Sequence, residues 1–544
     1  MRSIRWLLIG ATLVASVPGE PTLSQEVART PGELAWAIRY DPKTFDPAKV
    51  DEQASETIRF LTGGVLLRFN PRSQQPEPEL AESWSISPDG RTVSFHIRDG
   101  LHFSDGTGLT SRDVAWSLRR VLNPTTAAPV AEEFIAPQQV TVEVSDAQHV
   151  IVHLPQRLIG IGKVFDEIAI EPADRPSEGR VTSGAFAVVE YQQGQYVRMK
   201  ANPNYWKHDA AGVHLPYAAG IRLDILSNRE QEIARFQNGG YDLIESLPPE
   251  DFSLLAQKDS GAVRDLGPSL NTEQLWFNQS SHAALPNFEK KWFENRSFRV
   301  AISEAIHRSD LAKIAYDGHA TPAYDFISPA NTMWYNSHLH IPHLDVPDAI
   351  RLLASAGFVT KGGRLYDASG HAVKFSILTN SGNRARQKMA TLIQQDMAAL
   401  GIEVTVVTLD FPALIERLMH KMDYEACLLG LSNVDPDPNA MSNLWRSSSP
   451  NHQWNPSEAT PSTTWEAQID KDMDSQAGSP NPLERKRAID DVQQIVSDQQ
   501  PFIYLVYPNM LIAVSPRLAG VEPTVFQPGV LWNVTSLRLQ GHRP

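Results

Sequence analysis

The sequence predicts a mixed α/β fold with more than one domain, and three observations lead to this prediction. The chain has 544 residues, whereas a single hydrophobic core rarely grows beyond about 250–300 residues. Apolar and polar residues alternate from 92 to 98, as in a half-buried strand. Between 374 and 429, short apolar runs alternate with helical patterns, which indicates a sheet with crossover helices.

The elements along the chain are assigned from apolar periodicity and from the turn residues that bound each run. Predicted strands lie at 34–39, 92–98, 151–154, 221–226, 241–244, 275–278, 374–378, 403–407 and 425–429. Predicted helices lie at 56–67, 298–306, 349–356, 385–400 and 414–420. Their alternation is that of an α/β protein rather than an all-helical or all-strand one.

Residues 98–118, RDGLHFSDGTGLTSRDVAWSL, permit two interpretations. Acidic residues between glycines resemble a calcium loop, but Leu101 and Phe103 stand where oxygen ligands are needed. The alternative is two tight turns followed by a helix that Thr110 and Asp113 cap and that ends before Pro124. The spacing favours the turns and the capped helix.

The amino terminus has the pattern of a secretory signal. Arg2 and Arg5 precede an apolar run from 6 to 17, which Pro18 and Gly19 interrupt. The run is shorter than the about 20 residues of a membrane-spanning helix. We therefore expect residues 1–26 to be a signal peptide; the alternatives are an uncleaved anchor or a buried strand.

Composition and motifs exclude several functions. The formal net charge of −14 argues against a nucleic-acid partner. Cys427, the sole cysteine, lies in an apolar run and is expected to be a core residue. The sequence contains no nucleophile elbow, phosphate loop or zinc-protease motif, and the Gly160–Gly162 pair lacks the third glycine of a nucleotide fingerprint. We expect neither a cofactor nor an enzymatic activity.

A histidine-rich run offers a metal site as an alternative. His338, His340 and His343 stand near Asp345, and imidazole with carboxylate suits a borderline metal ion. The other interpretation is an irregular solvated connection that contains Pro342. We predict the connection and no metal site.

The most promising site follows a very apolar strand. Residues 435–439, DPDPN, come directly after the run 427–431 and precede Trp445. Ligands bind at strand ends in α/β sheets, in pockets that combine apolar walls with a few polar groups. Asp435 and Asp437 are therefore candidates, the alternative being a proline-fixed loop with solvated carboxylates.

Several longer segments together resemble the bacterial extracytoplasmic solute-binding proteins of the oligopeptide/dipeptide type, which serve ATP-driven importers. The likeness covers residues from about 33 to about 535. The segments that carry it are LAESWSISPDGRTVSFHIRDG (80–100), VTSGAF (181–186), NPNYW (202–206), FRVAISEAIHR (298–308), AIRLLASAGF (349–358) and QPFIY (500–504).

The resemblance implies a two-lobed periplasmic binding protein-like fold (type II), with an extra subdomain inserted in the first lobe. By this likeness the first lobe comprises 27–71, 182–272 and 508–544, and the inserted subdomain comprises 72–181. The second lobe is 273–507. The segment 98–118 then lies in the inserted subdomain.

The resemblance also implies ligand-binding positions. Asp51 matches an acidic residue that lines the pocket of peptide-binding members, and the strand at 430–434 matches one that pairs with an extended peptide. In those members an Asp after that strand binds the peptide ammonium, but Asp435 stands one residue later than this position, which Val434 occupies. Arg384 is a candidate for a solute carboxylate. The predicted ligand-binding residues are Asp51, Arg384, Gly430, Ser432, Asn433, Asp435 and Asp437.

A protein of this family is expected to be a non-enzymatic, monomeric periplasmic receptor. It closes over a peptide and presents it to the permease subunits of an ABC transporter. The alternatives are a non-peptide solute, such as a metal chelate, a glycoside or an amino-acid conjugate, and a secreted hydrolase or metalloenzyme.

Overall fold

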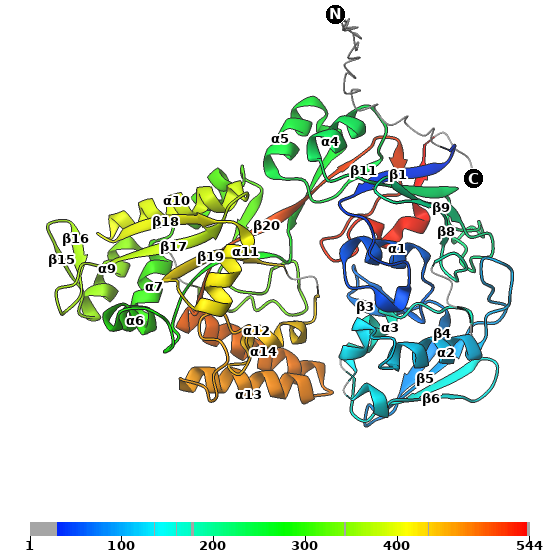
Figure 1. Cartoon of the computed structure of the whole chain (residues 1–544), viewed down its shortest axis with the longest axis horizontal. Helices are drawn as coiled ribbons and strands as arrows, with labels where there is room; N and C mark the ends of the chain where they lie inside the picture. Colours follow the sequence, from blue (N-terminus) through cyan, green and yellow to red (C-terminus); the bar gives the residue numbers. More distant parts are fainter. Residues whose placement is uncertain are drawn as a thin grey trace, which may run out of the picture.

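The computed structural model describes residues 30–540 except 135, 159, 174, 176–178, 342–343 and 433–434. The predicted signal peptide lies outside the described residues. The chain folds into two lobes joined by a narrow connection (Figure 1). The predicted two-lobed α/β fold is confirmed.

The first lobe is built on a four-stranded sheet in the order β1-β10-β9-β8, in which β1 pairs parallel to β10 and the other pairs are antiparallel. Alternate residues of these strands, such as Trp36 and Leu223, are buried beneath α1 and the carboxyl-terminal segment. Its elements are β1 (Glu33–Ile38), α1 (Gln53–Thr62), β8 (Phe186–Gln192), β9 (Tyr196–Ala201), β10 (Gly220–Ile225), α4 (Arg229–Gln237), α5 (Pro249–Lys258), β21 (Leu518–Ala519) and β22 (Arg538–Leu539).

The inserted subdomain has its own antiparallel sheet, in the order β4-β5-β7-β6, and its own core, to which Phe95, Val114 and Phe165 contribute. It lies at the blue-to-cyan end of the first lobe (Figure 1). Its elements are β2 (Leu67–Asn70), β3 (Gln75–Pro78), β4 (Ala81–Ile86), β5 (Thr92–Ile97), α2 (Ser111–Leu122), β6 (Thr141–Val144), β7 (His149–His153) and α3 (Ile161–Glu167).

The larger sheet runs from the first lobe into the second, in the strand order β11-β20-β13-β19-β17-β18, with β12 and β14 also pairing with β20; β11 and β12 belong to the first lobe. Its strands are β11 (Leu243–Ile244), β12 (Val263–Pro268), β13 (Thr272–Phe277), β14 (Ala320–Pro322), β17 (Lys374–Asn380), β18 (Glu403–Leu409), β19 (Ala426–Leu431) and β20 (Phe502–Val514), and a separate hairpin comprises β15 (Val359–Lys361) and β16 (Arg364–Tyr366). The helices are α6 (Asn287–Glu294), α7 (Arg296–Ala305), α8 (Arg308–Asp310), α9 (Val346–Ser355), α10 (Arg384–Ala399), α11 (Phe411–Ile415), α12 (Ser442–Trp445), α13 (Thr464–Gly478) and α14 (Pro482–Gln499).

Both faces of this sheet are buried. Leu275 and Leu428 face the core that α7, α9 and α10 cover, whereas Trp276 and Cys427 face the core that α13 and α14 cover. Burial on both faces explains why the run 427–431 is continuously apolar. Cys427 is fully buried, as predicted.

Strand β20 belongs to both lobes. Its first half, Phe502–Val506, pairs with β13, whereas its second half pairs with β12 and, at Ala513 and Val514, with β11. The chain also crosses between the lobes from β12 to β13. These changes of partner support the proposed lobe boundaries near 272 and 508.

The segment 98–118 forms two turns and a capped helix, as predicted. Thr110 and Asp113 make a reciprocal capping box, in which the Asp113 carboxylate accepts hydrogen bonds from the Thr110 N–H (2.8 Å) and hydroxyl (3.0 Å). The helix predicted over 56–67 is wrong at its carboxyl end. α1 ends at Thr62, because Gly63 takes an extended backbone conformation. Gly63 and Gly64 let the chain pack closely against Ala169 and Ser183 at this point.

The chain passes from the main part of the first lobe into the inserted subdomain and back through two segments that are in direct contact. The Gly184 N–H donates a 3.1 Å hydrogen bond to the Thr62 carbonyl. A Cβ atom on Gly184 would lie 2.3 Å from that carbonyl oxygen. The junction between the subdomains therefore requires glycine at this position.

A carboxyl group lies beside the connection between the lobes. Glu245 follows β11 directly, and its Oε1 accepts a 3.1 Å hydrogen bond from the Val530 N–H. Burial raises the pKa of Glu245 to about 7, from an ordinary value of 4.5. The folded protein thus holds this carboxyl group protonated over a pH range in which the unfolded chain has released the proton.

We expect Gly184→Ala to lower the free energy of unfolding by about 1–3 kcal/mol, the usual cost of overpacking a rigid site. Gly108→Ala is the matched control, because a Cβ atom there meets nothing within 4 Å. Denaturant unfolding followed by circular dichroism measures both variants. Equal midpoints for the two variants would contradict the close packing at the junction.

We expect the stability of the wild type to fall between about pH 5 and about pH 8 through Glu245, because the unfolded state binds fewer protons than the folded state in this range. Glu245→Gln removes this contribution, so the variant loses less stability over the range. Denaturant unfolding at both pH values measures the difference. Parallel pH profiles for the variant and the wild type would refute the raised pKa.

Candidate functional site

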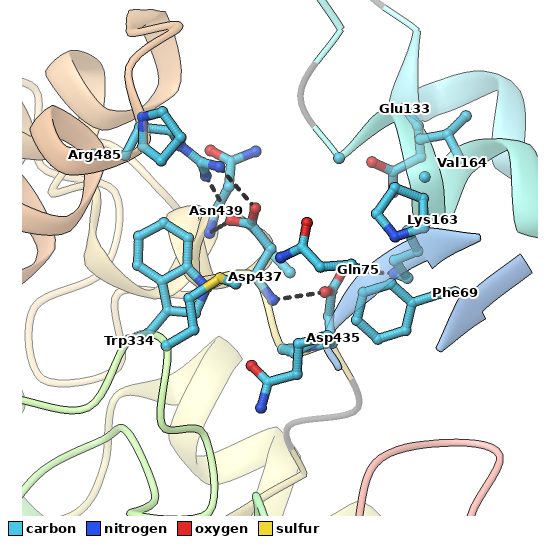
Figure 2. A pocket seen from close by; sticks show the side chains of 18 of the residues that line it. Phe69, Gln75, Glu133, Lys163, Val164, Trp334, Asp435, Asp437, Asn439 and Arg485 are labelled. Atoms are coloured by element: carbon cyan, nitrogen blue, oxygen red, sulfur yellow. Dashed lines mark hydrogen bonds and ion pairs between the residues drawn. The ribbon is translucent and has the colours of Figure 1, made fainter. Parts of the chain in front are cut away.

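A cavity of about 570 Å³ lies between the inserted subdomain and the second lobe (Figure 2). The first side is formed by the hairpin β2–β3, residue 133 and helix α3, and the second side by residues 333–334, 435–443 and 482–486. Figure 2 shows Phe69, Glu133, Lys163 and Val164 on one side, facing Trp334, Asp437, Asn439 and Arg485 on the other. Its size is ordinary for a small-molecule site.

One ion pair joins the two sides. The Lys163 Nζ atom in α3 donates to Asp435 Oδ2 at 2.5 Å. Burial lowers the pKa of Lys163, but the carboxylates of Asp435 and Glu167 raise it more, so the pKa lies above its ordinary value. Lys163 therefore stays charged, and each lobe contributes one charge to the same contact.

The second carboxylate of the loop is neutralised within its own lobe. Asp437 accepts two hydrogen bonds from the Arg485 guanidinium, at 2.9 and 2.6 Å. This guanidinium also lies 4.9 Å from the centre of the Trp334 ring. Asp437, Arg485 and Trp334 form a fixed wall of the cavity, because bidentate pairing restrains both side chains.

The sequence of the loop explains its shape. Asp435 Oδ1 accepts from the Asp437 N–H (2.8 Å), and Asp437 Oδ1 accepts from the Asn439 N–H (2.9 Å). Each Asp therefore closes a turn over the following proline. Asp437 is the N-cap of a 3-10 helix at Pro438–Met441, where proline suits the first position. The Asn331 amide further holds the loop by donating to the Pro436 carbonyl (2.7 Å).

A second cavity of about 440 Å³ adjoins the first and shares Lys163, Glu167 and Pro436 with it. Its lining is rich in acidic side chains. These acidic residues are Asp51, Glu52, Glu56, Asp166, Glu167 and Glu245. Burial raises the pKa of both Asp166 and Glu167. The second cavity thus combines six carboxyl groups with the cations Arg59 and Lys163, next to the cross-lobe ion pair.

The structure brings together three of the residues that the sequence singled out. Asp435 and Asp437 line the first cavity, and Asp51 lines the second, where it is exposed and lies 3.2 Å from Lys43 Nζ. Arg384 is exposed on the first turn of α10 and lines neither cavity. Asn433 lies outside the described residues.

Gly430 and Ser432 lie at the end of β19, and neither is among the lining residues of the two cavities. Gly430 makes room for an ion pair, because a Cβ atom there would lie 2.4 Å from Arg386 Nη2. Arg386 Nε donates to the buried Glu273 carboxylate at 2.7 Å. Ser432 is exposed.

The sequence does not single out Lys163, Trp334 or Arg485 as site residues. The glycines that precede Lys163 match only an incomplete nucleotide fingerprint. A Cβ atom on Gly162 would lie 2.5 Å from Pro76 Cβ, so this glycine lets α3 pack against β3. That packing places Lys163 at the cavity. No local pattern marks Trp334 or Arg485, which come from a loop and from α14.

The histidine-rich run does not gather a ligand set in the part of the chain that the structure describes. His338 is exposed, and the backbone carbonyl of His340 accepts a 2.6 Å hydrogen bond from Ser497. His343 lies outside the described residues. Among residues 30–540 as described, no helix has the length and apolarity needed to span a membrane.

Comparisons with known proteins agree with this architecture. The family model described as bacterial extracellular solute-binding proteins, family 5 (middle) matches residues 75–453. The oligopeptide-binding protein AppA of Bacillus subtilis is 23% identical over 527 residues, which cover 90% of this chain and 89% of that protein. Heme-binding protein A of Haemophilus influenzae is 27% identical over 562 residues, which cover 95% and 96%.

A solved structure shows the same fold. The ABC transporter substrate-binding protein CtaP of Listeria monocytogenes superposes with a TM-score of 0.76 at 21% identity, covering 93% of this chain and 99% of that one. The family model spans more than half of the sequence. The chain therefore belongs to the bacterial extracellular solute-binding proteins of family 5.

Proposed function

We propose that this protein is the receptor of an ABC importer for short peptides, and that it binds the two charged ends of a peptide between its lobes. The cross-lobe pair of Lys163 and Asp435 carries the proposal. It places an ammonium group and a carboxylate in one cavity, 2.5 Å apart. In this proposal the peptide separates the pair, so that its amino terminus contacts Asp435 and its carboxyl terminus contacts Lys163.

The exchange of partners is energetically balanced. Separating a partly buried ion pair leaves two partly desolvated charges without partners, which is unfavourable unless each charge finds a new partner. A zwitterionic peptide supplies both partners, and each charge-assisted hydrogen bond contributes about 1.5–3 kcal/mol. A neutral solute, or a solute with one charge only, leaves at least one buried group unpaired. The pair therefore selects solutes with both charges.

The rest of the cavity suits side chains of varied chemistry. Apolar contact comes from Phe69, Pro76, Val164 and Trp334. Asp437 is already paired with Arg485, so it supports the wall rather than taking the ammonium. The volume of about 570 Å³ favours a short peptide over a long one, because it lies within the range of small-molecule pockets.

The family supports the receptor role, and the names of its relatives include both peptide and non-peptide solutes. AppA is named for oligopeptides, and the Haemophilus influenzae protein for haem. A second candidate is therefore a non-peptide solute, such as an amino-acid conjugate, a glycoside or a metal chelate. The acidic lining of the second cavity favours this candidate for a solute with additional positive charge.

The remaining parts of the proposal follow from this role. Residues 1–26 export the chain to the periplasm, where the liganded monomer docks on the permease subunits of the importer. In this role the protein needs no cofactor and breaks no bond.

Ser442 lies in the first cavity but is not arranged as a nucleophile. Its hydroxyl donates to the Asn439 carbonyl (2.7 Å), whereas the hydroxyl of a nucleophile is hydrogen-bonded to a base.

We expect the wild type to prefer a free dipeptide or tripeptide over its acetylated form by about 10–100-fold, that is by about 1.4–2.8 kcal/mol. Asp435→Asn abolishes this preference, because the carboxylate that distinguishes the two is gone. Lys163→Gln abolishes the corresponding preference for a free over an amidated carboxyl terminus. Isothermal titration calorimetry measures each ratio.

Asp423→Asn is the matched control for these variants. Asp423 also lies in the second lobe and pairs with a cation, Arg417 at 3.3 Å, but it lines neither cavity. Its preferences should equal those of the wild type. If Asp435→Asn still discriminates between free and acetylated peptides, another group binds the amino terminus.

We also expect native mass spectrometry of the purified protein to show short peptides that are released on denaturation. Added dipeptides and tripeptides should raise the melting temperature, since ligands that bind only the folded state stabilise it. A co-purified solute of another chemical class would favour the second candidate. Absence of both a co-purified solute and a thermal shift would count against peptide binding.

A further inference from the structure

Three ionisable side chains meet in the interior of the second lobe, away from both cavities. His452 belongs to the loop 447–463 and is fully buried. The side chains of Glu458, in the same loop, and Glu466, on the first turn of α13, are 5% and 3% exposed. One ligand atom from each lies within 4.8 Å of the other two. Such a buried cluster needs compensating interactions, because unpaired charges are costly in the interior.

The hydrogen bonds around His452 determine which ring nitrogen faces the carboxylates. His452 Nδ1 lies 3.0 Å from the Leu444 carbonyl oxygen. A carbonyl oxygen only accepts, so Nδ1 carries the proton and Nε2 carries the lone pair of a neutral ring. His452 Nε2 and Glu458 Oε1 are both buried without a hydrogen-bond partner.

The distances between these atoms are too long for hydrogen bonds. His452 Nε2 lies 3.8 Å from Glu458 Oε1 and 3.6 Å from Glu466 Oε1. Metal ligands bonded at about 2.0–2.2 Å with tetrahedral or wider angles are about 3.3–3.8 Å apart. The two distances from His452 Nε2 match this spacing, and the two carboxylate oxygens lie within 4.8 Å of each other.

Every ligand in the cluster is also held by a neighbour. Glu458 Oε2 accepts from the Ser462 N–H (2.5 Å) and hydroxyl (2.6 Å). Glu466 Oε2 accepts from the Thr463 hydroxyl at 2.7 Å, and Glu466 Oε1, the oxygen nearest His452, also accepts from the Trp454 ring N–H at 3.0 Å. Such outer hydrogen bonds orient metal ligands in proteins.

Charge leads to the same conclusion. When both carboxylates are ionised and the imidazole is neutral, the cluster carries two negative charges, which a divalent cation cancels. We propose that His452, Glu458 and Glu466 form a site for a divalent transition-metal ion such as Zn²⁺. Imidazole and carboxylate ligands suit Zn²⁺ and its neighbours in the first transition row, whereas Ca²⁺ and Mg²⁺ prefer oxygen alone.

The position of the site gives it a structural role. The ion would fix the first turn of α13 to the loop that precedes it. Near the other end of α13, Gln476 Nε2 donates to Asn439 Oδ1 (2.7 Å), and the Gln476 side-chain oxygen accepts from Arg485 (3.0 Å). Asn439 and Arg485 both line the first cavity. The metal therefore supports the cavity wall without contacting the solute.

The test uses the full purified chain, stripped with EDTA and dialysed, and titrated with Zn²⁺ against a chromophoric chelator. We expect one Zn²⁺ per chain and a rise in melting temperature that EDTA reverses. We expect His452→Gln and Glu458→Gln each to weaken Zn²⁺ binding by at least about tenfold. Co²⁺ in place of Zn²⁺ should give visible absorption in the wild type and lose it in both variants.

His338→Gln is the matched control, since His338 is exposed in the same lobe, and it should bind Zn²⁺ like the wild type. The proposal is overturned if the wild type binds no Zn²⁺, if both cluster variants keep wild-type affinity, or if His338→Gln removes binding. Should His452→Gln fail to fold, Glu458→Gln decides the outcome, because glutamine keeps the size and the hydrogen-bond acceptor.

Discussion

Strand β20 is the constraint on which the arrangement of both lobes depends. One half of this 13-residue strand is an inner strand of the second lobe, and the other half pairs with the short strands of the first. Because the strand is hydrogen-bonded along its length, including to β14 in its middle, it fixes where each lobe begins. The shared strand thus aligns the two sides of the cavity.

Charge placement across the cavity differs between its two sides. The second lobe neutralises one of its two loop carboxylates internally, through Arg485, and leaves the other to Lys163 of the inserted subdomain. Because the partner of Asp435 belongs to the other lobe, the electrostatic state of the cavity depends on how the lobes are placed. The acidic residues of the adjoining cavity favour retention of a positive charge at this point.

Most of the fold is predictable from local patterns. Period-two alternation, turn glycines and the capping box of Thr110 and Asp113 are all properties of short segments, and they predicted β5 and the start of α2 correctly, whereas β20 was not among the predicted strands. The end of α1 was not predictable. It depends on Gly63 and Gly64, which also pack closely against Ala169 and Ser183, residues more than 100 positions away.

The site was only half predictable for the same reason. The two Asp residues follow an apolar strand and are visible in the sequence, but Lys163 is separated from Asp435 by 272 positions. Arg384 and Arg386 show that the sequence also cannot tell which of two nearby arginines faces the interior. They are two residues apart on α10, and only packing determines that Arg386 faces Glu273 while Arg384 faces solvent.

The pair of Lys163 and Asp435 has a consequence for how the affinity for a solute depends on salt. Under the proposed mode of binding, the pair acts as an internal competitor in the unliganded protein, so the apparent affinity for a solute is reduced by the fraction of molecules in which the pair is formed. Salt weakens a partly exposed ion pair. Higher ionic strength therefore increases the receptive fraction, in opposition to its usual effect of slowing the encounter between charged molecules.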